Sequence, residues 1–385
     1  MESVNICAYA RTPVGKFRGS LSKYSATELG AMAVKELLKR AKINPNDDSV
    51  NQLYMGHVLQ AGTGQAPCRQ VALNAGMSYQ TPCTTINKVC GSSLKAVMIG
   101  ASDIRAKVAN LIIAGGMESM SNAPYFIKNP VKDEKINFSD LEWVLSHDGL
   151  KDAYSGEMMG ETGEIVAKEF DISREQSDTY AVRSHRLANE GWEKGWLNKE
   201  SFEIDGIVKD EGIRVDTNLD KMSKLRSIFH DNGQVTAGNA SQLSDGASAV
   251  LIASDYAVKK YDLPILAKII DYCTSGLEPS RVMSAPITAV EMLLSRNKLE
   301  IDDIDIIEHN EAFASASCSI QKALKISDDK FNLHGGAVAI GHPLGATGTR
   351  CLMTLVNALN RTSGRYGIVT ICLGGGNAIA MLIES

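Results

Sequence analysis

Residues 87–93 read NKVCGSS, and this stretch decides the fold because it turns the chain from a short strand into a helix. The apolar spacing that follows predicts a helix over residues 92–107. After it come a continuous apolar run at 111–114, typical of a buried strand, and the pair Gly115-Gly116. Turn, helix, buried strand and glycine cluster therefore form one unit of the fold.

The same order returns near the C-terminus. Residues 341–345 read GHPLG, a helix is predicted over 347–359, and a buried strand over 367–372 ends at a glycine cluster. The two copies agree in architecture rather than letter by letter, so we infer a duplicated α/β layer. Short strands without polar alternation, interleaved with helices, favour parallel sheets covered on both faces.

Between the two copies lies a long excursion that lacks the regular strand rhythm. It is rich in charge, contains all three tryptophans and shows a helical pattern near residues 173–194. A long excursion inside a compact fold is usually functional. We therefore predict an N-terminal half of residues 1–120 plus about 244–265, a loop domain of residues 121–243, and a C-terminal half of residues 266–385.

Composition excludes several classes of protein. Of the 385 residues, 44% are hydrophobic and 22% are charged, as in an ordinary globular protein. Lys and Arg total 40 against 45 acidic residues, and the net charge of −5 gives no support to a nucleic-acid or membrane partner. No apolar run approaches the roughly 20 residues of a membrane span. The N-terminus shows no signal-peptide pattern, so we expect a cytoplasmic protein.

The eight cysteines include no Cys-x-x-Cys pair. This spacing argues against a disulfide framework and against a structural zinc site. Buried thiols in a reducing cytosol are the simplest interpretation, with one or two cysteines left for chemistry. We expect no metal ion and no bound cofactor.

Two residues at helix starts are candidates for chemistry. Cys90 precedes a helix whose N–H groups and dipole favour an anion, which predicts a lowered thiol pKa. The alternative is an ordinary buried cysteine. His342 lies in a glycine-dense turn that contains neither a phosphate-binding Gly-Lys-Ser/Thr nor a Gly-x-Gly-x-x-Gly pattern. Its imidazole could accept a thiol proton and donate to an oxyanion, or simply bond local backbone.

Two further candidate residues lie at or just after the ends of predicted strands. Cys372 ends the last strong strand, and Asn310 follows a strand predicted at residues 304–307, just before a helix predicted over 311–324. Ligands of parallel α/β sheets gather at the carboxyl ends of the strands. We therefore expect Cys90, Asn310, His342 and Cys372 at one edge of the sheets.

At this point the chain resembles the thiolase family. The resemblance is carried by four motifs in the family's order: NKVCGS (87–92), NEAFA (310–314), GHPLGATG (341–348) and CLGGG (372–376). The segments ARTP (10–13), GGMESMS (115–121) and VTAGNAS (235–241) match as well. The resemblance covers essentially the whole chain and is closest to the acetyl-CoA acetyltransferase, or acetoacetyl-CoA thiolase, group.

This resemblance implies a duplicated five-layered α-β-α-β-α core with an inserted loop domain that covers coenzyme A. It implies an acyltransferase that reversibly condenses two acetyl-CoA molecules into acetoacetyl-CoA and coenzyme A. These thioesters are substrates, so no cofactor is expected. It also implies self-association as a homotetramer, or at least as a dimer. The direction of net flux is left open.

The resemblance also implies roles for individual residues. Cys90 would take the acyl group, and Cys372 would remove a proton from the methyl of the second acetyl-CoA. His342 would activate Cys90 and, with a water held by Asn310, polarise the thioester oxygen. The N–H groups of Cys90 and Gly374 would form a second oxyanion hole. Positions that match the coenzyme A channel or acyl pocket of relatives are Ser241, Ala240, Leu225, Phe229 and Met159.

Three positions depart from the family pattern, and the last two match positions near the acyl pocket of relatives. His309 stands where relatives usually carry an apolar residue, Met158 stands where many short-chain members have His, and residues 282–286 also differ. Met159 favours a short acyl pocket. The alternatives are a 3-ketoacyl-CoA thiolase of broader or longer chain length, and a thiolase-shaped scaffold that binds acyl-CoA without turnover.

Overall fold

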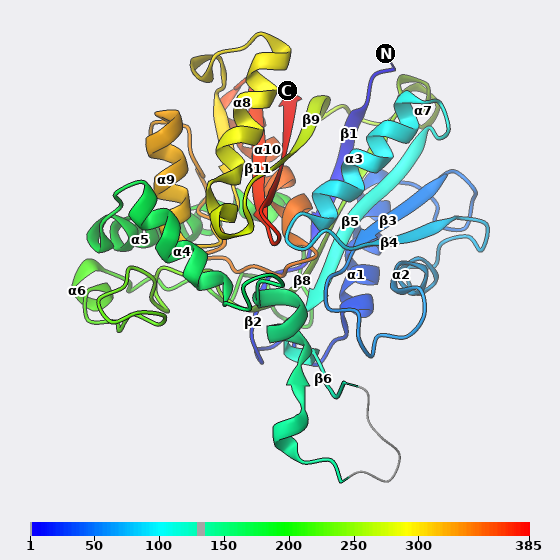
Figure 1. Ribbon diagram of the computed structural model, residues 1–385. Helices are drawn as coiled ribbons and strands as arrows, with labels where there is room; N and C mark the ends of the chain where they lie inside the picture. Colours follow the sequence, from blue (N-terminus) through cyan, green and yellow to red (C-terminus); the bar gives the residue numbers. More distant parts are fainter. Residues whose placement is uncertain (1, 129–134) are drawn as a thin grey trace.

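The computed structural model describes residues 2–128 and 135–385. Its central strands are hydrogen-bonded in the order β10-β11-β12-β9-β1-β8-β5-β3-β4, with the short β2 at the side of β8 (Figure 1). The bounds of these strands are β1 (Asn5–Arg11), β2 (Gly15–Lys16), β3 (Gln52–Gly56), β4 (Cys83–Ile86), β5 (Leu111–Ser119), β8 (Ser244–Ala253), β9 (Ala267–Gly276), β10 (Ile306–His309), β11 (Tyr366–Leu373) and β12 (Asn377–Glu384).

The strand order shows the predicted duplication. The N-terminal half runs β4-β3-β5-β8-β1, and the C-terminal half runs β10-β11-β12-β9. The place of β4 is taken in the second half by Phe331, which forms a parallel bridge with Ile307 of β10. The two halves join where β1 and β9 pair antiparallel over only two positions, Asn5↔Lys268 and Ile6↔Ala267.

Helices cover both halves on both faces. Their bounds are α1 (Ala26–Ala41), α2 (Pro67–Asn74), α3 (Ser92–Arg105), α7 (Asp255–Tyr261), α8 (Ala285–Asn297), α9 (Ala314–Leu324) and α10 (Thr347–Thr362). One core cluster joins α1 and α2 to the N-terminal strands, and another joins α8 and α9 to the C-terminal strands. A third places α3 and α10 between the two sets of strands. The predicted five-layered α-β-α-β-α fold is confirmed.

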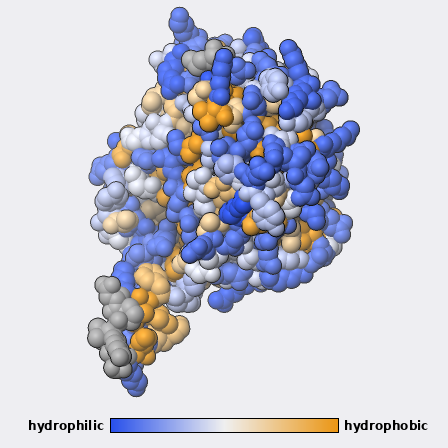
Figure 2. Space-filling model, turned by 90° about the vertical axis from the view of Figure 1, so that its right-hand side faces the viewer, coloured by the Kyte–Doolittle hydropathy of each residue, from blue (hydrophilic) through white to orange (hydrophobic). Residues whose placement is uncertain are grey.

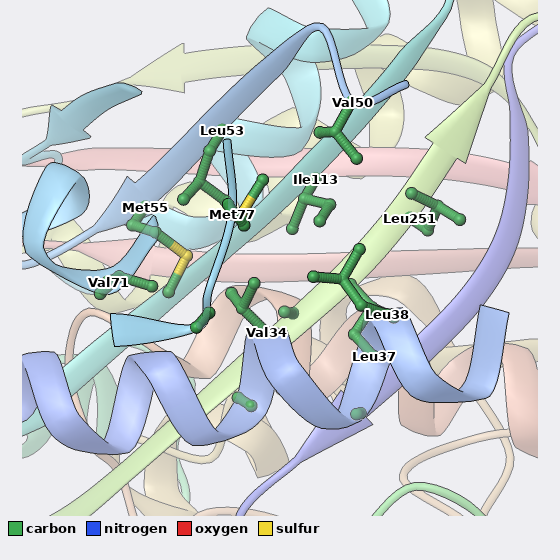
Figure 3. Close-up of a cluster of buried hydrophobic side chains, with 14 of the residues drawn as sticks. Val34, Leu37, Leu38, Val50, Leu53, Met55, Val71, Met77, Ile113 and Leu251 are labelled. Carbon is green, nitrogen blue, oxygen red and sulfur yellow. The ribbon is translucent and has the colours of Figure 1, made fainter. Parts of the chain in front are cut away.

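The outer cluster of the N-terminal half shows how one such layer is packed. Helix α1 presents Val34, Leu37 and Leu38 to the sheet, where they meet Leu53 of β3 and Ile113 of β5 (Figure 3). These side chains are almost fully removed from water. Apolar burial of this kind stabilises each layer by roughly 1.5–3 kcal/mol per large side chain.

The capping pattern of the sequence fixes the start of α1. Ser25 Oγ accepts the N–H of Glu28 at 3.3 Å, and Glu28 Oε2 accepts the N–H of Ser25 at 2.8 Å. This reciprocal pair satisfies two N–H groups that have no partner inside the helix. The helix therefore begins at Ala26.

The expectation of parallel sheets is wrong for half of the strands. β3 pairs parallel with β4 and β5, and β10 pairs parallel with β11. However, β12 and β8 run antiparallel to β11 and β5. In the C-terminal half, β11 and β12 run antiparallel because the turn at residues 374–376 that joins them is too short to connect parallel strands. The sheets are therefore mixed.

The excursion leaves the N-terminal half after β5 and returns at β8. Its elements are β6 (Tyr125–Phe126), β7 (Glu142–Trp143), a π-helical turn (Leu145–Leu150), α4 (Met159–Glu169), α5 (Arg174–Glu193) and α6 (Leu219–Met222). The antiparallel pair β6–β7 lies on an arm that projects from the body at the bottom of Figure 1. Within residues 2–128 and 135–385, no helix has the length and apolar character that a membrane span requires.

A buried ion cluster ties the excursion to both halves. The Arg11 guanidinium of β1 donates to Glu200 at 3.1 Å and to Asp210 at 2.7 and 3.0 Å. Glu200 in turn accepts from Thr354 and Asn357 of α10. The side chains of Arg11 and its two acidic partners are at most 1% exposed, so every charge depends on its neighbours for solvation.

Replacing Arg11 by methionine should therefore destabilise the protein strongly. Removal of one partner leaves two carboxylates buried without compensation, which typically costs about 3–5 kcal/mol. The matched control is Lys23→Met, which breaks the Lys23–Asp205 pair at the surface, where Lys23 is 57% exposed. That change should cost far less, because water and salt screen an exposed pair. Urea unfolding of the parent and both variants measures the difference, and equal losses would contradict the analysis.

Candidate active site

Cys90 lies in a strained turn between β4 and α3. The residue before it, Val89, has φ +46°, a left-handed conformation that a β-branched side chain rarely adopts. Hydrogen bonds hold this turn: Ser92 Oγ accepts the N–H of Lys88 at 2.8 Å and donates to Val89 O at 2.6 Å. Asn87 Oδ1 accepts the N–H of Val89 at 3.0 Å. These hydrogen bonds within NKVCGSS therefore fix the position of the Cys90 thiol.

The expected lowering of the Cys90 pKa is wrong. Burial raises the pKa of this thiol to about 12, although the N–H groups of Cys90 and Gly374 favour its thiolate. Loss of water around the sulfur outweighs the local dipoles. The resting residue is a neutral thiol, and it needs a base at the moment of reaction.

His342 is placed by hydrogen bonds on both ring nitrogens. Its Nδ1 lies 2.6 Å from Thr347 Oγ1, whose own hydroxyl is 3.0 Å from Pro343 O and donates to it. Thr347 must then accept from Nδ1–H, which leaves the lone pair on Nε2. Nε2 lies 3.3 Å from Asn310 Nδ2. Burial, followed by the nearby Arg350 guanidinium, lowers the pKa of His342 to about 3, so the ring is a neutral acceptor.

Asn310 directly follows β10 and is fully buried. Its backbone N–H donates to Thr370 O of β11 at 3.1 Å, which fixes it at the carboxyl edge of the parallel pair. Its Nδ2 faces His342, and its Oδ1 has no protein partner among the described residues. A buried acceptor of this kind is a natural place for a water molecule.

Cys372 lies near the end of β11, before the glycine turn. Its Sγ is 3.6 Å from Met283 Sδ, and its side chain is almost fully buried. Burial, and then the Cys90 thiol, raise the pKa of Cys372 above its usual range. Beside it, Gly375 and Gly376 adopt φ +83° and +78°, which lets the turn close without strain.

These residues line one cavity of about 50 Å³. Of the residues predicted from the sequence, the cavity is lined by Cys90, His342, Cys372, Gly374, Ser241 and Met159. Asn310 joins them through its contact with His342. Apolar side chains close the rest of the wall, among them Leu150, Val282, Met283, Phe313 and Leu344. Two sulfurs and one imidazole therefore share a space that suits a two-carbon fragment.

Three predicted channel residues do not line this cavity. Leu225 packs against Gly238, where an added Cβ would lie 2.5 Å from the leucine. Phe229 packs in the same manner over Gly160 of α4. Ala240 forms a bridge with Phe313 behind the cavity. Their role in binding coenzyme A stays a prediction.

Two further features next to Asn310 are the late start of the following helix and the unusual residue His309. The helix predicted from residue 311 begins only at Ala314, because the backbone on either side of Phe313 bonds to the excursion instead. Ser241 N donates to Ala312 O at 2.9 Å, and Ala314 N donates to Asn239 O at 2.8 Å. His309 is fully buried and stacks on Phe331, so this unusual residue is part of the core.

Sequence reasoning missed two contributors to the site. Thr347 selects the tautomer of His342, and its position in GHPLGATG, five residues after the histidine, was the available signal. Met283 contacts Cys372, but only the fold brings residue 283 to the end of β11.

Comparison with known proteins agrees with this geometry. Residues 4–256 match the family model described as "Thiolase, N-terminal domain", and residues 263–385 match "Thiolase, C-terminal domain". The chain is 42% identical to "Acetyl-CoA acetyltransferase 2" of Arabidopsis thaliana, over 100% of this chain and 98% of the relative. It is 40% identical to "Acetyl-CoA acetyltransferase" of Cupriavidus necator, over the full length of both.

Solved structures show the same likeness in three dimensions. The crystal structure of human mitochondrial 3-ketoacyl-CoA thiolase superposes with a TM-score of 0.94 at 37% identity, covering 100% of this chain and 99% of that one. The same human protein in complex with CoA gives a TM-score of 0.95, with 100% and 98% covered. Both family models and the full-length relatives therefore lead to one conclusion: the chain belongs to the thiolase family.

Proposed function

We propose that this protein is an acetyl-CoA C-acetyltransferase, which reversibly joins two acetyl-CoA molecules into acetoacetyl-CoA and coenzyme A. The observation that carries the proposal is the small cavity lined together by Cys90, His342 and Cys372. The names of the Arabidopsis and Cupriavidus relatives support it. A neutral thiol beside a neutral imidazole provides a nucleophile and its base.

The first half-reaction transfers an acetyl group to Cys90. His342 Nε2 takes the Cys90 proton, and the thiolate attacks the thioester carbonyl. The N–H groups of Cys90 and Gly374, which already favour a charge on the sulfur, stabilise the tetrahedral oxyanion. Coenzyme A leaves with the proton of Cys372. The products are an acetyl-thioester on Cys90, a thiolate on Cys372 and a protonated His342.

The second half-reaction forms the carbon–carbon bond. The Cys372 thiolate removes a proton from the methyl of a second acetyl-CoA. The enolate oxygen is held by His342 Nε2–H and by a water at the unpartnered Oδ1 of Asn310. The enolate attacks acetyl-Cys90, acetoacetyl-CoA departs, and the Cys90 thiolate recovers its proton from His342. Cys90, His342 and Cys372 end in their starting protonation states, because the methyl proton of the second acetyl-CoA replaces the Cys372 proton that left with coenzyme A. No cofactor enters the scheme.

The cavity also bears on chain length. At about 50 Å³, with Met159 and Met283 in its wall, it has room for a short acyl group. The second candidate function is a 3-ketoacyl-CoA thiolase of longer chain length, because the solved human relatives carry that name. Rates of thiolysis of four-carbon and sixteen-carbon 3-ketoacyl-CoA distinguish the two candidates.

We also propose that the protein assembles with copies of itself, as a homotetramer or at least as a dimer, through the β6–β7 arm. The arm exposes Tyr125, Ile136 and Phe138, at 48%, 52% and 76% of their surface. Figure 2 shows apolar side chains gathered on this projection. Apolar surface on a projecting arm is typical of an interaction site. Light scattering of the purified protein gives the mass that tests this assembly.

A cytoplasmic location is proposed on chemical grounds. All eight cysteines are free, and none is paired in a disulfide. Free thiols persist where the compartment is reducing. The reaction would place the protein in the metabolism of lipids and other acyl-CoA compounds.

Substitution of the two sulfurs should separate the two half-reactions. Cys90→Ala should gain no acetyl group from acetyl-CoA and should lose thiolysis by about 10³-fold or more, because the nucleophile is gone. Cys372→Ala should lose condensation but keep some acetylation on Cys90. Mass spectrometry of the intact protein and its peptides measures both outcomes. Cys318→Ala, a half-buried cysteine outside the cavity, is the control. Full activity of Cys90→Ala would refute the assignment.

Removing side-chain atoms from the cavity wall should weaken the preference for short acyl chains. Met159→Ala removes several heavy atoms from the wall, and one methylene of fit is worth about 1–3 kcal/mol in discrimination. We expect the ratio of six-carbon to four-carbon thiolysis, as kcat/KM, to rise at least about tenfold. Met32→Ala on α1, far from the cavity, should leave the ratio unchanged. An unchanged ratio in Met159→Ala would show that Met159 does not limit chain length.

A further inference from the structure

Glu118 is a buried carboxylate to which the mechanism above gives no part. It lies one residue from the end of β5, in the segment GGMESMS, and none of its surface is exposed. A charged group so deep in the protein needs several partners to replace water. The identity of those partners points to its role.

Three backbone N–H groups bond the Glu118 carboxylate, and the His57 ring lies close to it. Oε2 accepts the backbone N–H of Val58 at 3.1 Å and that of Gly345 at 2.9 Å. Oε1 accepts the N–H of Leu59 at 3.1 Å and lies 3.3 Å from His57 Nε2. The three N–H groups therefore engage both oxygens of the carboxylate.

The donors belong to two loops that carry the proposed chemistry. Gly345 follows His342 by three residues and leads into α10. Residues 57–59 follow β3 and are bonded to the turn of Cys90: His57 N donates to Ile86 O at 2.9 Å, and Asn87 Nδ2 donates to Val58 O at 3.4 Å. One carboxylate therefore ties the His342 loop of the C-terminal half to the Cys90 turn of the N-terminal half.

The backbones around this carboxylate approach as closely as glycine allows. A Cβ on Gly116 would lie 1.9 Å from Gly345 O, and a Cβ on Gly345 would lie 2.5 Å from Met117 O. The His342 loop thus rests directly on β5, and Glu118 supplies the hydrogen bond at its inner end. A small change in these bonds would move the loop relative to Cys90.

We propose that Glu118 is a positioning residue for the reaction, which sets the distance between the His342 imidazole and the Cys90 thiol through its bonds to Gly345, Val58 and Leu59. This inference rests on the proposed function. Glu118 does not line the cavity that holds the two sulfurs and the imidazole. It acts on the chemical steps and not on the binding of coenzyme A, since the loops that it holds bear the nucleophile and its base. A shift of even 1 Å between such groups can cost about 10²-fold in rate.

Two substitutions separate position from charge. In Glu118→Gln the amide must turn its NH₂ toward donors on one side or the other, because both oxygens of the native carboxylate accept N–H groups. In Glu118→Asp the charge remains, but the side chain is one methylene shorter and cannot reach both loops. If the negative charge itself were the contribution, the aspartate variant would keep the activity of the parent.

The experiment measures kcat and KM for thiolysis of acetoacetyl-CoA by the full-length protein, with circular dichroism and thermal unfolding to follow the folded state. We expect both Glu118 variants to lose at least about tenfold in kcat with KM within about threefold of the parent. The control is Glu200→Gln, an equally buried glutamate in the Arg11 cluster. It should lower the melting temperature but leave kcat per folded molecule unchanged.

A milder pair of variants keeps the test decisive if the Glu118 variants do not fold. His57→Phe removes the ring nitrogen that lies 3.3 Å from the carboxylate, and His57→Gln keeps a polar N–H at this position. We expect kcat to fall about threefold or more in His57→Phe, with rescue in His57→Gln and KM unchanged in both. Equal kcat values in the parent and His57→Phe would then overturn the proposal.

Two results separate this inference from the function on which it rests. A parent protein without turnover of acetoacetyl-CoA would contradict the proposed function, and the role of Glu118 with it. An active parent together with a folded Glu118→Gln variant whose kcat is within twofold of the parent would overturn the role of Glu118 alone. A loss of kcat no larger than that of Glu200→Gln would overturn it as well.

Discussion

The close packing of α3 against α10 in the middle layer is the constraint on which the rest of the structure depends. A Cβ on Gly348, near the start of α10, would lie 2.4 Å from the backbone nitrogen of Leu94 in α3. Ser93 Oγ accepts the N–H of Thr349 at 3.0 Å across the same contact. Because the turn of Cys90 opens one helix and the loop of His342 opens the other, packing the two helix starts together brings the thiol and the imidazole to one cavity.

The two halves differ in the connection between two equivalent strands, and the long connection of the N-terminal half helps to form the cavity. In the N-terminal half, 124 residues separate β5 from β8, and they include α4 with Met159 in the cavity wall. In the C-terminal half the equivalent connection is the glycine turn between β11 and β12. The short turn leaves Cys372 and Gly374 at the cavity, while the long excursion between β5 and β8 covers the cavity. The two copies of one unit thus contribute different parts of the same site.

Much of this arrangement could be predicted from the sequence, because its signals are local. Turns that open helices located Cys90 and His342, and strand ends located Asn310 and Cys372. What the sequence could not give depends on distant parts of the chain. The pKa of Cys90 rises because the assembled cavity excludes water, against the local dipole. The antiparallel pairing of β5 with β8 in the N-terminal half depends on how the excursion returns.

The same limit applies to single side chains at the site. Glu118 has partners some 60 and more than 220 residues away, and no spacing rule would pair them. Met283 reaches Cys372 only because the second half folds back on itself. The residues expected along the coenzyme A channel were carried over by resemblance, and Leu225, Phe229 and Ala240 lie outside the cavity that the structure defines.

The Arg11 cluster has a consequence for the cooperativity of the molecule. Its members come from β1, from the excursion and from α10, so none of these three segments can detach without taking a hydrogen-bond partner from a buried charge. Local openings usually follow boundaries that few strong contacts cross. Here such contacts cross both boundaries, so we expect the two halves and the excursion to unfold together.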